Sequence, residues 1–151
     1  MNPDVRTILL AEDNANDVEL TLMALKTNNV LSEVVVTRDG AETLDYLLRR
    51  RQYADREPGD PGLMLLDLKM PKIDGLEVLK QVKSNPQFRT IPIVVLTSSR
   101  EEQDLVRSYN FGVNAYVVKP VEFHDFVDAI KLVGGFWAVV NEPPPTGAAR
   151  A

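Results

Sequence analysis

The sequence contains no cysteine. A chain without thiols forms no disulfide and no thiolate metal site, and it has no cysteine to use as a nucleophile. Redox chemistry therefore does not mark the compartment of this protein, and candidate functional groups must be sought among its other side chains.

The sequence also lacks a long hydrophobic run. No apolar stretch approaches the roughly 18 to 20 residues that span a membrane. The N-terminal stretch MNPDVRTILLAED reaches acidic residues within a few positions of its apolar run, which is unlike a signal peptide or an anchor. We therefore expect a cytoplasmic protein that does not bind a membrane.

Positive charge is in deficit, since the formal net charge at pH 7 is −5. This balance disfavours non-specific binding to a phosphate backbone, although Arg49, Arg50 and Arg51 stand together. We interpret the arginine triplet as a solvated helix end, and we expect no nucleic-acid partner.

What the sequence does contain is an ordinary globular composition, 44% hydrophobic and 26% charged, over 151 residues, a length that suits one domain. Short β-branched runs alternate with amphipathic stretches, which is typical of an α/β protein with a doubly wound parallel sheet. Strands are predicted at residues 7–11, 33–37, 62–67, 91–97 and 115–119. Helices are predicted at residues 16–28 and 41–51 and around 76–82, 105–109 and 123–130.

Turn residues agree with this division. Asp39-Gly40 and Asp74-Gly75 stand where loops should turn into helices, and Asn85-Pro86 should end the third helix. The last residues, 141–151, have no apolar periodicity, and we expect an extended or disordered tail there. No second domain is expected.

Ionisable and hydroxyl side chains stand at the carboxyl ends of four predicted strands: Glu12 and Asp13, Asp67, Thr97, and Lys119. Ligands of an open parallel α/β sheet bind outside the carboxyl ends of its strands. Each residue alone has a simpler explanation, because Asp13 suits a helix cap, Thr97 is an ordinary strand residue, and Lys119 precedes a proline that stops a strand.

Taken together, these side chains suggest a metal site. Crowded carboxylates at one edge of a sheet repel each other unless a cation lies among them. Ligands that are all oxygen select a hard cation, and an open cluster suits Mg²⁺. Positioning and electrostatic stabilisation are most of what phosphoryl transfer requires, and Asp67, at the end of an apolar strand, is the natural nucleophile.

The same residues, within Glu12-Asp13, LLDLKMPKIDG, Thr97 and Lys119-Pro120, resemble the receiver domain of two-component response regulators. The likeness covers residues 5–140 and implies a CheY-like, flavodoxin-like (βα)5 fold with strand order 2-1-3-4-5. It implies that Asp67 accepts a phosphoryl group from a partner histidine kinase. Such a protein is a phosphoacceptor that catalyses its own phosphorylation and dephosphorylation, and not an enzyme with a separate substrate.

The resemblance also assigns roles to single residues. Mg²⁺ would be held by Asp13, Asp67 and the backbone carbonyl of Lys69, with Glu12 acting through water. Lys119 would bind the phosphoryl group and Thr97 would move toward it. The side chains of Lys69 and Ser99 would tune the lifetime of the acyl phosphate.

Tyr116, three residues before Lys119, resembles the aromatic that swings inward during switching. Packing on an edge strand explains this tyrosine equally well, and both interpretations stay open.

The predicted fifth helix carries more apolar surface than a solvent-facing helix needs. We expect a homodimer through the face formed by helix 4, strand 5 and helix 5, with Phe126, Val133, Phe136 and Trp137 at the interface. The alternative is that Gly134-Gly135 breaks the helix and the remainder folds back locally. The ending GGFWAVVNEPPP and the long loop after helix 2 resemble single-domain regulators of bacterial phytochrome histidine kinases, which implies a phytochrome kinase as partner.

Three other functions are weaker. A phosphatase of the haloacid dehalogenase type needs a second acid two residues after the nucleophile, where this chain has Lys69. A flavin carrier on the same fold needs a phosphate loop after strand 1, where AEDNAND is acidic. A non-phosphorylated adaptor remains open if Asp67 proves inert.

Overall fold

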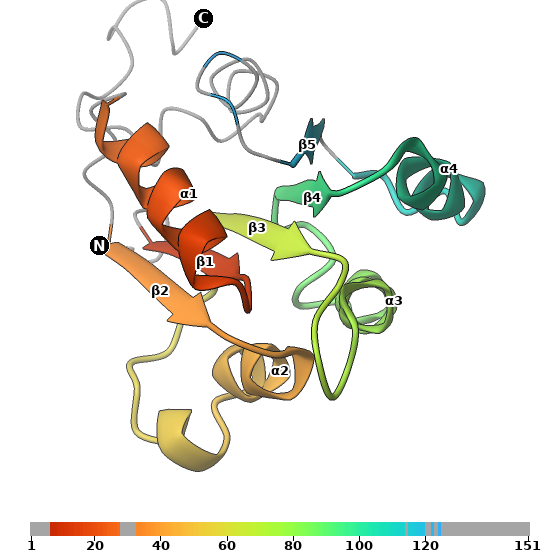
Figure 1. Ribbon diagram of the computed structural model, residues 1–151. Coiled ribbons are helices and arrows are strands. Elements are labelled where there is room, and N and C mark those ends of the chain that lie inside the picture. The colour runs from red at the N-terminus through yellow and green to blue at the C-terminus, as the bar shows by residue number, and fades with distance from the viewer. Residues whose placement is uncertain (1–6, 28–32, 114, 120–121, 123, 125–151) are drawn as a thin grey trace, which may run out of the picture.

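A computed structural model of the chain describes residues 7–27, 33–113, 115–119, 122 and 124. Its strands form a parallel five-stranded sheet in the order β2-β1-β3-β4-β5 (Figure 1). The strands are β1 (Thr7–Ala11), β2 (Glu33–Thr37), β3 (Leu63–Asp67), β4 (Ile93–Thr97) and β5 (Ala115–Val118). The predicted fold class and strand order are confirmed.

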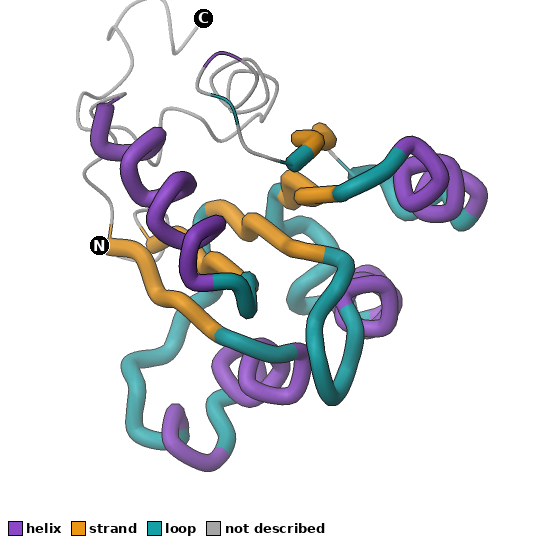
Figure 2. Tube along the Cα trace, viewed as in Figure 1, coloured by secondary structure: helices purple, strands orange, loops and turns teal. Residues whose placement is uncertain are grey.

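Four α-helices are described, and they cover both faces of the sheet (Figure 2). They are α1 (Ala15–Thr27), α2 (Gly40–Leu48), α3 (Gly75–Ser84) and α4 (Arg100–Ser108), and a short 3-10 helix, η2 (Arg51–Tyr53), follows α2. The predicted fifth helix, the predicted dimer interface and the tail at 141–151 lie outside the described residues. Among the described residues, no helix has the length and apolar character needed to cross a membrane.

The core has two layers because side chains alternate across each strand. Ile8 and Leu10 of β1 pack with residues of α1 on one face, whereas Leu9 packs with residues of α2 and α3 on the other. Every residue of β3 and β4 is buried, as expected for central strands of a sheet covered on both faces. The central strands are therefore rigid supports for whatever follows their carboxyl ends.

The helix starts follow the predicted turn chemistry. Asp39 accepts a hydrogen bond from the backbone N–H of Glu42, at 2.7 Å, and caps α2. Asp74 accepts one from the N–H of Glu77, at 2.9 Å, and caps α3. Asn85 ends α3 as predicted.

The arginine triplet is exposed at the end of α2, as interpreted from the sequence, but two of its members also have a structural role. Helix α2 ends at Leu48, three residues earlier than predicted, because Arg49 adopts a left-handed conformation with φ of 56°. This turn brings Arg50 and Arg51 back onto Asp45, whose carboxylate lies 3.2 Å and 3.0 Å from their guanidinium nitrogens and is only 8% exposed. A buried carboxylate needs such partners, so two of the three arginines have a structural role.

Three strand ends also differ from the prediction, and the first is the start of β3, which lies at Leu63 and not at residue 62. Strand β4 begins at Ile93 and not at residue 91, because Pro92 has no N–H to donate to a ladder. The Pro92 carbonyl still accepts a hydrogen bond from the N–H of Met64, at 2.9 Å. Strand β5 ends at Val118, one residue before Lys119.

Candidate functional site

Three acidic side chains meet at the carboxyl ends of β1 and β3. These strands are neighbours, with Ala11 paired to Leu66, so the residues that follow them are brought together. Carboxylate oxygens of Glu12, Asp13 and Asp67 all lie within 4.8 Å of one another. Glu12 and Asp67 are buried, whereas Asp13 is exposed at the mouth of the cluster.

The side chain of Lys119, which follows the edge strand β5, extends into this cluster. Its Nζ lies 2.8 Å from Glu12 Oε1 and 3.0 Å from Asp67 Oδ2, and its side chain is only 14% exposed. The start of its side chain is placed by a backbone hydrogen bond of 2.7 Å from the Lys119 N–H to the Thr97 carbonyl. One ammonium therefore compensates two buried carboxylates that come from different strands.

A fourth carboxylate, that of Asp17, completes the surroundings of Lys119, and the sequence analysis did not identify it. Asp17 Oδ2 lies 3.0 Å from Lys119 Nζ. Asp17 is in the first turn of α1, the helix that begins just after the Glu12-Asp13 pair, so the start of this helix lies beside the carboxyl end of β1. The position of this acid in the first turn after β1 is the signal that could have indicated it.

The simpler explanation of Asp13 as a helix cap does not hold. The side chain of Asn14 takes that role instead, because its Oδ1 accepts a hydrogen bond from the Asp17 N–H at 3.0 Å. The Asn14 carbonyl accepts the first helical hydrogen bond, from Val18, also at 3.0 Å. The Asp13 carboxylate is thus left at the mouth of the cluster, where it lies with Glu12 and Asp67.

The electrostatics of the cluster favour binding of a cation. Burial raises the pKa of Glu12 to about 7, and the neighbouring Asp67 carboxylate acts in the same direction, while the hydrogen bond from Lys119 lowers it. Burial also acts to lower the pKa of Lys119, but hydrogen bonds to Glu12, Asp17 and Asp67 outweigh it and leave that pKa above its usual value. The ammonium is therefore charged at neutral pH, and the carboxylates around it still outnumber it.

The donor set suits a hard divalent ion. All candidate ligands are oxygens, and Glu12, Asp13 and Asp67 could hold a metal ion together. The Lys69 N–H donates to Asp67 Oδ1 at 3.2 Å, so the start of the loop after β3 is folded back onto the same carboxylate. This placement brings the backbone of Lys69 next to the acids.

Thr97 lies at the end of β4, next to Asp67 in the sheet. Asp67 pairs with Leu96, so Thr97 is one step beyond it on the neighbouring strand. Its Oγ1 is buried and has no hydrogen-bond partner among the described residues. Buried hydroxyls are normally paired, so this one is available to a group that enters the site.

Tyr116 lies on β5, further from the acids. Its ring is half-buried, and the Arg107 guanidinium lies 4.6 Å from the ring centroid. This contact agrees with the packing interpretation of Tyr116 in this arrangement of the chain.

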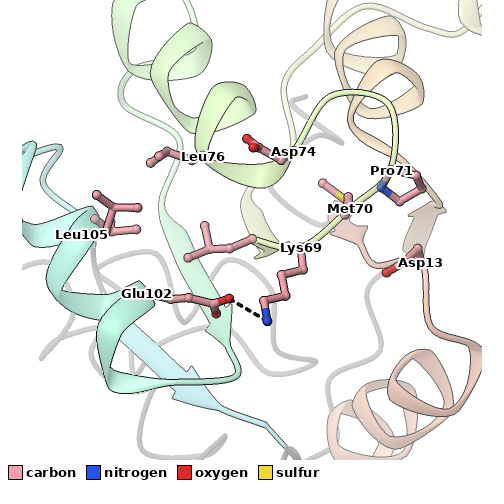
Figure 3. A pocket seen from close by; sticks show the side chains of 10 residues that line it. Asp13, Lys69, Met70, Pro71, Asp74, Leu76, Glu102 and Leu105 are labelled. Carbon is pink, nitrogen blue, oxygen red and sulfur yellow. Dashed lines mark ion pairs between the residues drawn. The ribbon is translucent and has the colours of Figure 1, made fainter.

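A groove of about 570 Å³ opens beside the acids, between the loop after β3 and helix α4. Asp13 lies at one end and Leu105 at the other, and Lys69 reaches across toward Glu102 (Figure 3). Lys69 Nζ lies 3.5 Å from Glu102 Oε2. The site is therefore open to solvent on this side.

Comparison with known proteins identifies the family. The model of the response regulator receiver domain matches residues 8–131. Response regulator Rcp1 from Synechocystis sp. is 39% identical over 132 residues, which are 87% of this chain and 88% of Rcp1.

Solved structures agree with this assignment. The bacteriophytochrome response regulator RtBRR is 58% identical with a TM-score of 0.85, and the match covers 95% of this chain and 87% of that one. The bacteriophytochrome response regulator AtBRR is 61% identical with a TM-score of 0.83, covering 91% and 98%. The Mn(2+)-bound form of Rcp1 is 37% identical with a TM-score of 0.72, covering 93% and 99%. This chain therefore belongs to the response regulator receiver domain family, and it is related to the response regulators of phytochromes.

Proposed function

We propose that Asp67 accepts a phosphoryl group from a partner histidine kinase, with Mg²⁺ bound beside it. The observation that carries this proposal is the buried Asp67 carboxylate, 3.0 Å from Lys119 Nζ, at the end of a strand whose neighbour ends in Thr97, a residue with a buried hydroxyl that has no hydrogen-bond partner among the described residues. A carboxylate beside an ammonium and two further acids, with a hydroxyl at the end of the neighbouring strand, has what phosphoryl transfer needs: a nucleophile and groups that take up the added negative charge.

In the transfer step, an Asp67 oxygen forms a bond to phosphorus while the bond from phosphorus to the histidine nitrogen of the kinase breaks. The electron pair of the breaking bond stays on that nitrogen. Lys119 is already in hydrogen-bond contact with Asp67 Oδ2, so a small shift of its side chain places the ammonium on a phosphoryl oxygen. The Thr97 hydroxyl then gains an acceptor through a movement toward the same group.

The metal would be held by Asp13, Asp67 and the Lys69 carbonyl, with Glu12 acting through water. The ion would neutralise part of the negative charge of the carboxylates and of the phosphoryl oxygens. The relative Rcp1 has a Mn(2+)-bound form, which supports the binding of a divalent ion by this chain, and the preference of open all-oxygen sites favours Mg²⁺.

The kinase partner we propose is a bacterial phytochrome. Two of the similar structures are bacteriophytochrome response regulators, which supports this pairing. We further propose a receiver domain over residues 5–140, a tail at 141–151, a cytoplasmic location and a switch that involves Tyr116. Phosphorylation would alter the face of helix 4, strand 5 and helix 5, where Phe126, Val133, Phe136 and Trp137 would form a homodimer.

The first test is intact mass after incubation with acetyl phosphate, with and without Mg²⁺. We expect one phosphoryl adduct on the wild type that depends on the metal and is absent from Asp67→Asn. Asp55→Asn is the matched control, because Asp55 is exposed and lies in the loop after η2. An adduct on Asp67→Asn, or a folded wild type that is never labelled by acetyl phosphate or by a phytochrome kinase, would contradict the proposal.

A further inference from the structure

Glu102 makes contacts that its position on the surface of a helix does not require. It stands in the first turn of α4, yet its side chain is only 16% exposed. Its Oε1 accepts a hydrogen bond of 2.8 Å from the Ser98 backbone N–H and lies 3.3 Å from the Ser98 hydroxyl. Glu102 is therefore bound to the turn that joins β4 to α4.

Both serines of the turn between β4 and α4 form hydrogen bonds with Glu102. Ser99 caps α4, because its Oγ accepts a hydrogen bond of 3.2 Å from the Glu102 N–H. The Glu102 carboxylate returns to Ser98, so backbone and side chain of one residue bind two successive serines. Such reciprocal capping fixes the path by which the chain enters the helix.

Glu102 also forms an ion pair across the groove, but this contact is the weaker one. Lys69 Nζ lies 3.5 Å from Glu102 Oε2, and the Lys69 side chain is 73% exposed (Figure 3). Exposed ion pairs of this kind contribute little, whereas a hydrogen bond from a backbone N–H to a carboxylate is charge-assisted and directed. The contact with Ser98 therefore carries the argument.

Ser98 directly follows Thr97, whose buried hydroxyl has no hydrogen-bond partner in the described part of the chain. A movement of the Thr97 backbone toward a phosphoryl group on Asp67 carries the Ser98 N–H with it, since the Thr97 carbonyl and the Ser98 N–H share a planar peptide unit. That movement lengthens or breaks the hydrogen bond to Glu102. The restraint thus acts on the part of the chain that switching has to displace.

We propose that Glu102 is a positioning residue that restrains the turn after β4 and so opposes the switching movement of Thr97. This inference rests on the proposed phosphorylation of Asp67. Loss of the restraint shifts the resting protein toward the arrangement in which Thr97 binds the phosphoryl group, and a larger share of molecules is then ready to react.

The test compares Glu102→Ala and Glu102→Gln with the control Glu101→Ala. Glu101 is the adjacent acid in the same first turn of α4 and is exposed, so its loss changes the charge near the helix end to the same extent. Glutamine at 102 keeps an oxygen that can accept from Ser98, whereas alanine does not. If Glu102 acted only by repelling a negatively charged phosphodonor, the labelling rate would change equally in both Glu102 variants. If Glu102 acts by restraining the turn, Glu102→Ala changes more than Glu102→Gln.

The first measurement is amide exchange of Ser98 by NMR in the unphosphorylated protein. We expect exchange about fivefold faster in Glu102→Ala, the factor that corresponds to roughly 1 kcal/mol, with Glu102→Gln between it and the wild type. Glu101→Ala should match the wild type within about twofold. Equal exchange in Glu101→Ala and Glu102→Ala would overturn the restraint.

The second measurement is the rate of Asp67 labelling by acetyl phosphate with Mg²⁺, together with the affinity for beryllofluoride as a phosphoryl analogue. Glu102→Ala should be labelled faster and bind the analogue more tightly, by about the same fivefold factor. Faster Ser98 exchange with unchanged or slower labelling would overturn the link to switching. A wild type that is never labelled would overturn the proposed function alone, because Ser98 exchange still decides the restraint. If circular dichroism shows that Glu102→Ala does not fold, Glu102→Leu, which also lacks an acceptor for the Ser98 N–H, takes its place in both measurements.

Discussion

Lys119 Nζ lies 3.0 Å from Asp67 Oδ2 although β4 separates β3, which ends at Asp67, from β5, which Lys119 follows. The contact is possible because a lysine side chain is long enough to cross the end of one intervening strand. This ion pair links the edge strand β5 to the central strand β3, at the end of the sheet where the predicted phosphoacceptor lies.

Replacing Lys119 should destabilise the metal-free protein. In Lys119→Met the buried carboxylates of Glu12 and Asp67 lose their ammonium, and removal of one partner of a buried ion pair costs about 3 kcal/mol, less here because the cluster adjoins solvent. Urea denaturation measures the change, and Lys72→Met is the control, since Lys72 is 70% exposed. Equal stability of the two variants would show that Lys119 does not compensate these acids.

Thr97→Val should separate stability from labelling. The variant removes a buried hydroxyl that has no partner among the described residues, so we expect it to keep or gain about 1 kcal/mol in the unphosphorylated state. Labelling by acetyl phosphate should become slower, because the phosphoryl group loses a donor. Denaturation and intact mass measure the two effects.

Thr43→Val is the matched comparison for Thr97→Val. The Thr43 hydroxyl is also buried, but it lies 2.7 Å from Thr37 Oγ1 and 2.8 Å from the Asp39 carbonyl. Its loss should cost about 1 kcal/mol or more. A Thr97→Val protein that is destabilised as strongly as Thr43→Val would show that Thr97 has an acceptor in the resting protein.

Gly75→Ala should disturb Asp67 directly. A Cβ on Gly75 would collide with the Asp67 carbonyl and the Leu68 Cα, because the start of α3 packs against the end of β3. We expect a loss of about 2 kcal/mol, as for overpacked cores, and a loss of labelling. Gly112→Ala is the control: its Cβ meets nothing within 4 Å, and only the positive φ of 73° opposes it.

Mg²⁺ should stabilise the protein through Asp13. A ligand that binds only the folded state adds about 2.7 kcal/mol at a concentration of 100 times its Kd. We expect the melting temperature to rise with Mg²⁺ and to return when a chelator removes the metal. Asp13→Asn should remove most of this response and Asp55→Asn none of it. An unchanged response in Asp13→Asn would place the metal elsewhere.

Much of the fold follows from local pattern. Alternating apolar residues and the turn residues at Asp39, Asp74 and Asn85 determine where strands and helices begin and end. Where a proline or a left-handed residue interrupts the pattern, the prediction fails by one to three residues, as at Pro92 and Arg49. Neither interruption changes the order of the strands.

The sequence by itself determined that acids, a hydroxyl and a lysine stand at strand ends, because parallel strands present those ends at one edge. Only the tertiary structure decided which of them touch. The contacts of Lys119 with Asp17 and of Glu102 with Ser98 depend on how the helices dock on the sheet and on the turns that lead into them. Whether two side chains form a contact depends on differences of a few ångströms in their separation. The periodicity of a sequence does not determine the distances between elements that are far apart in the chain.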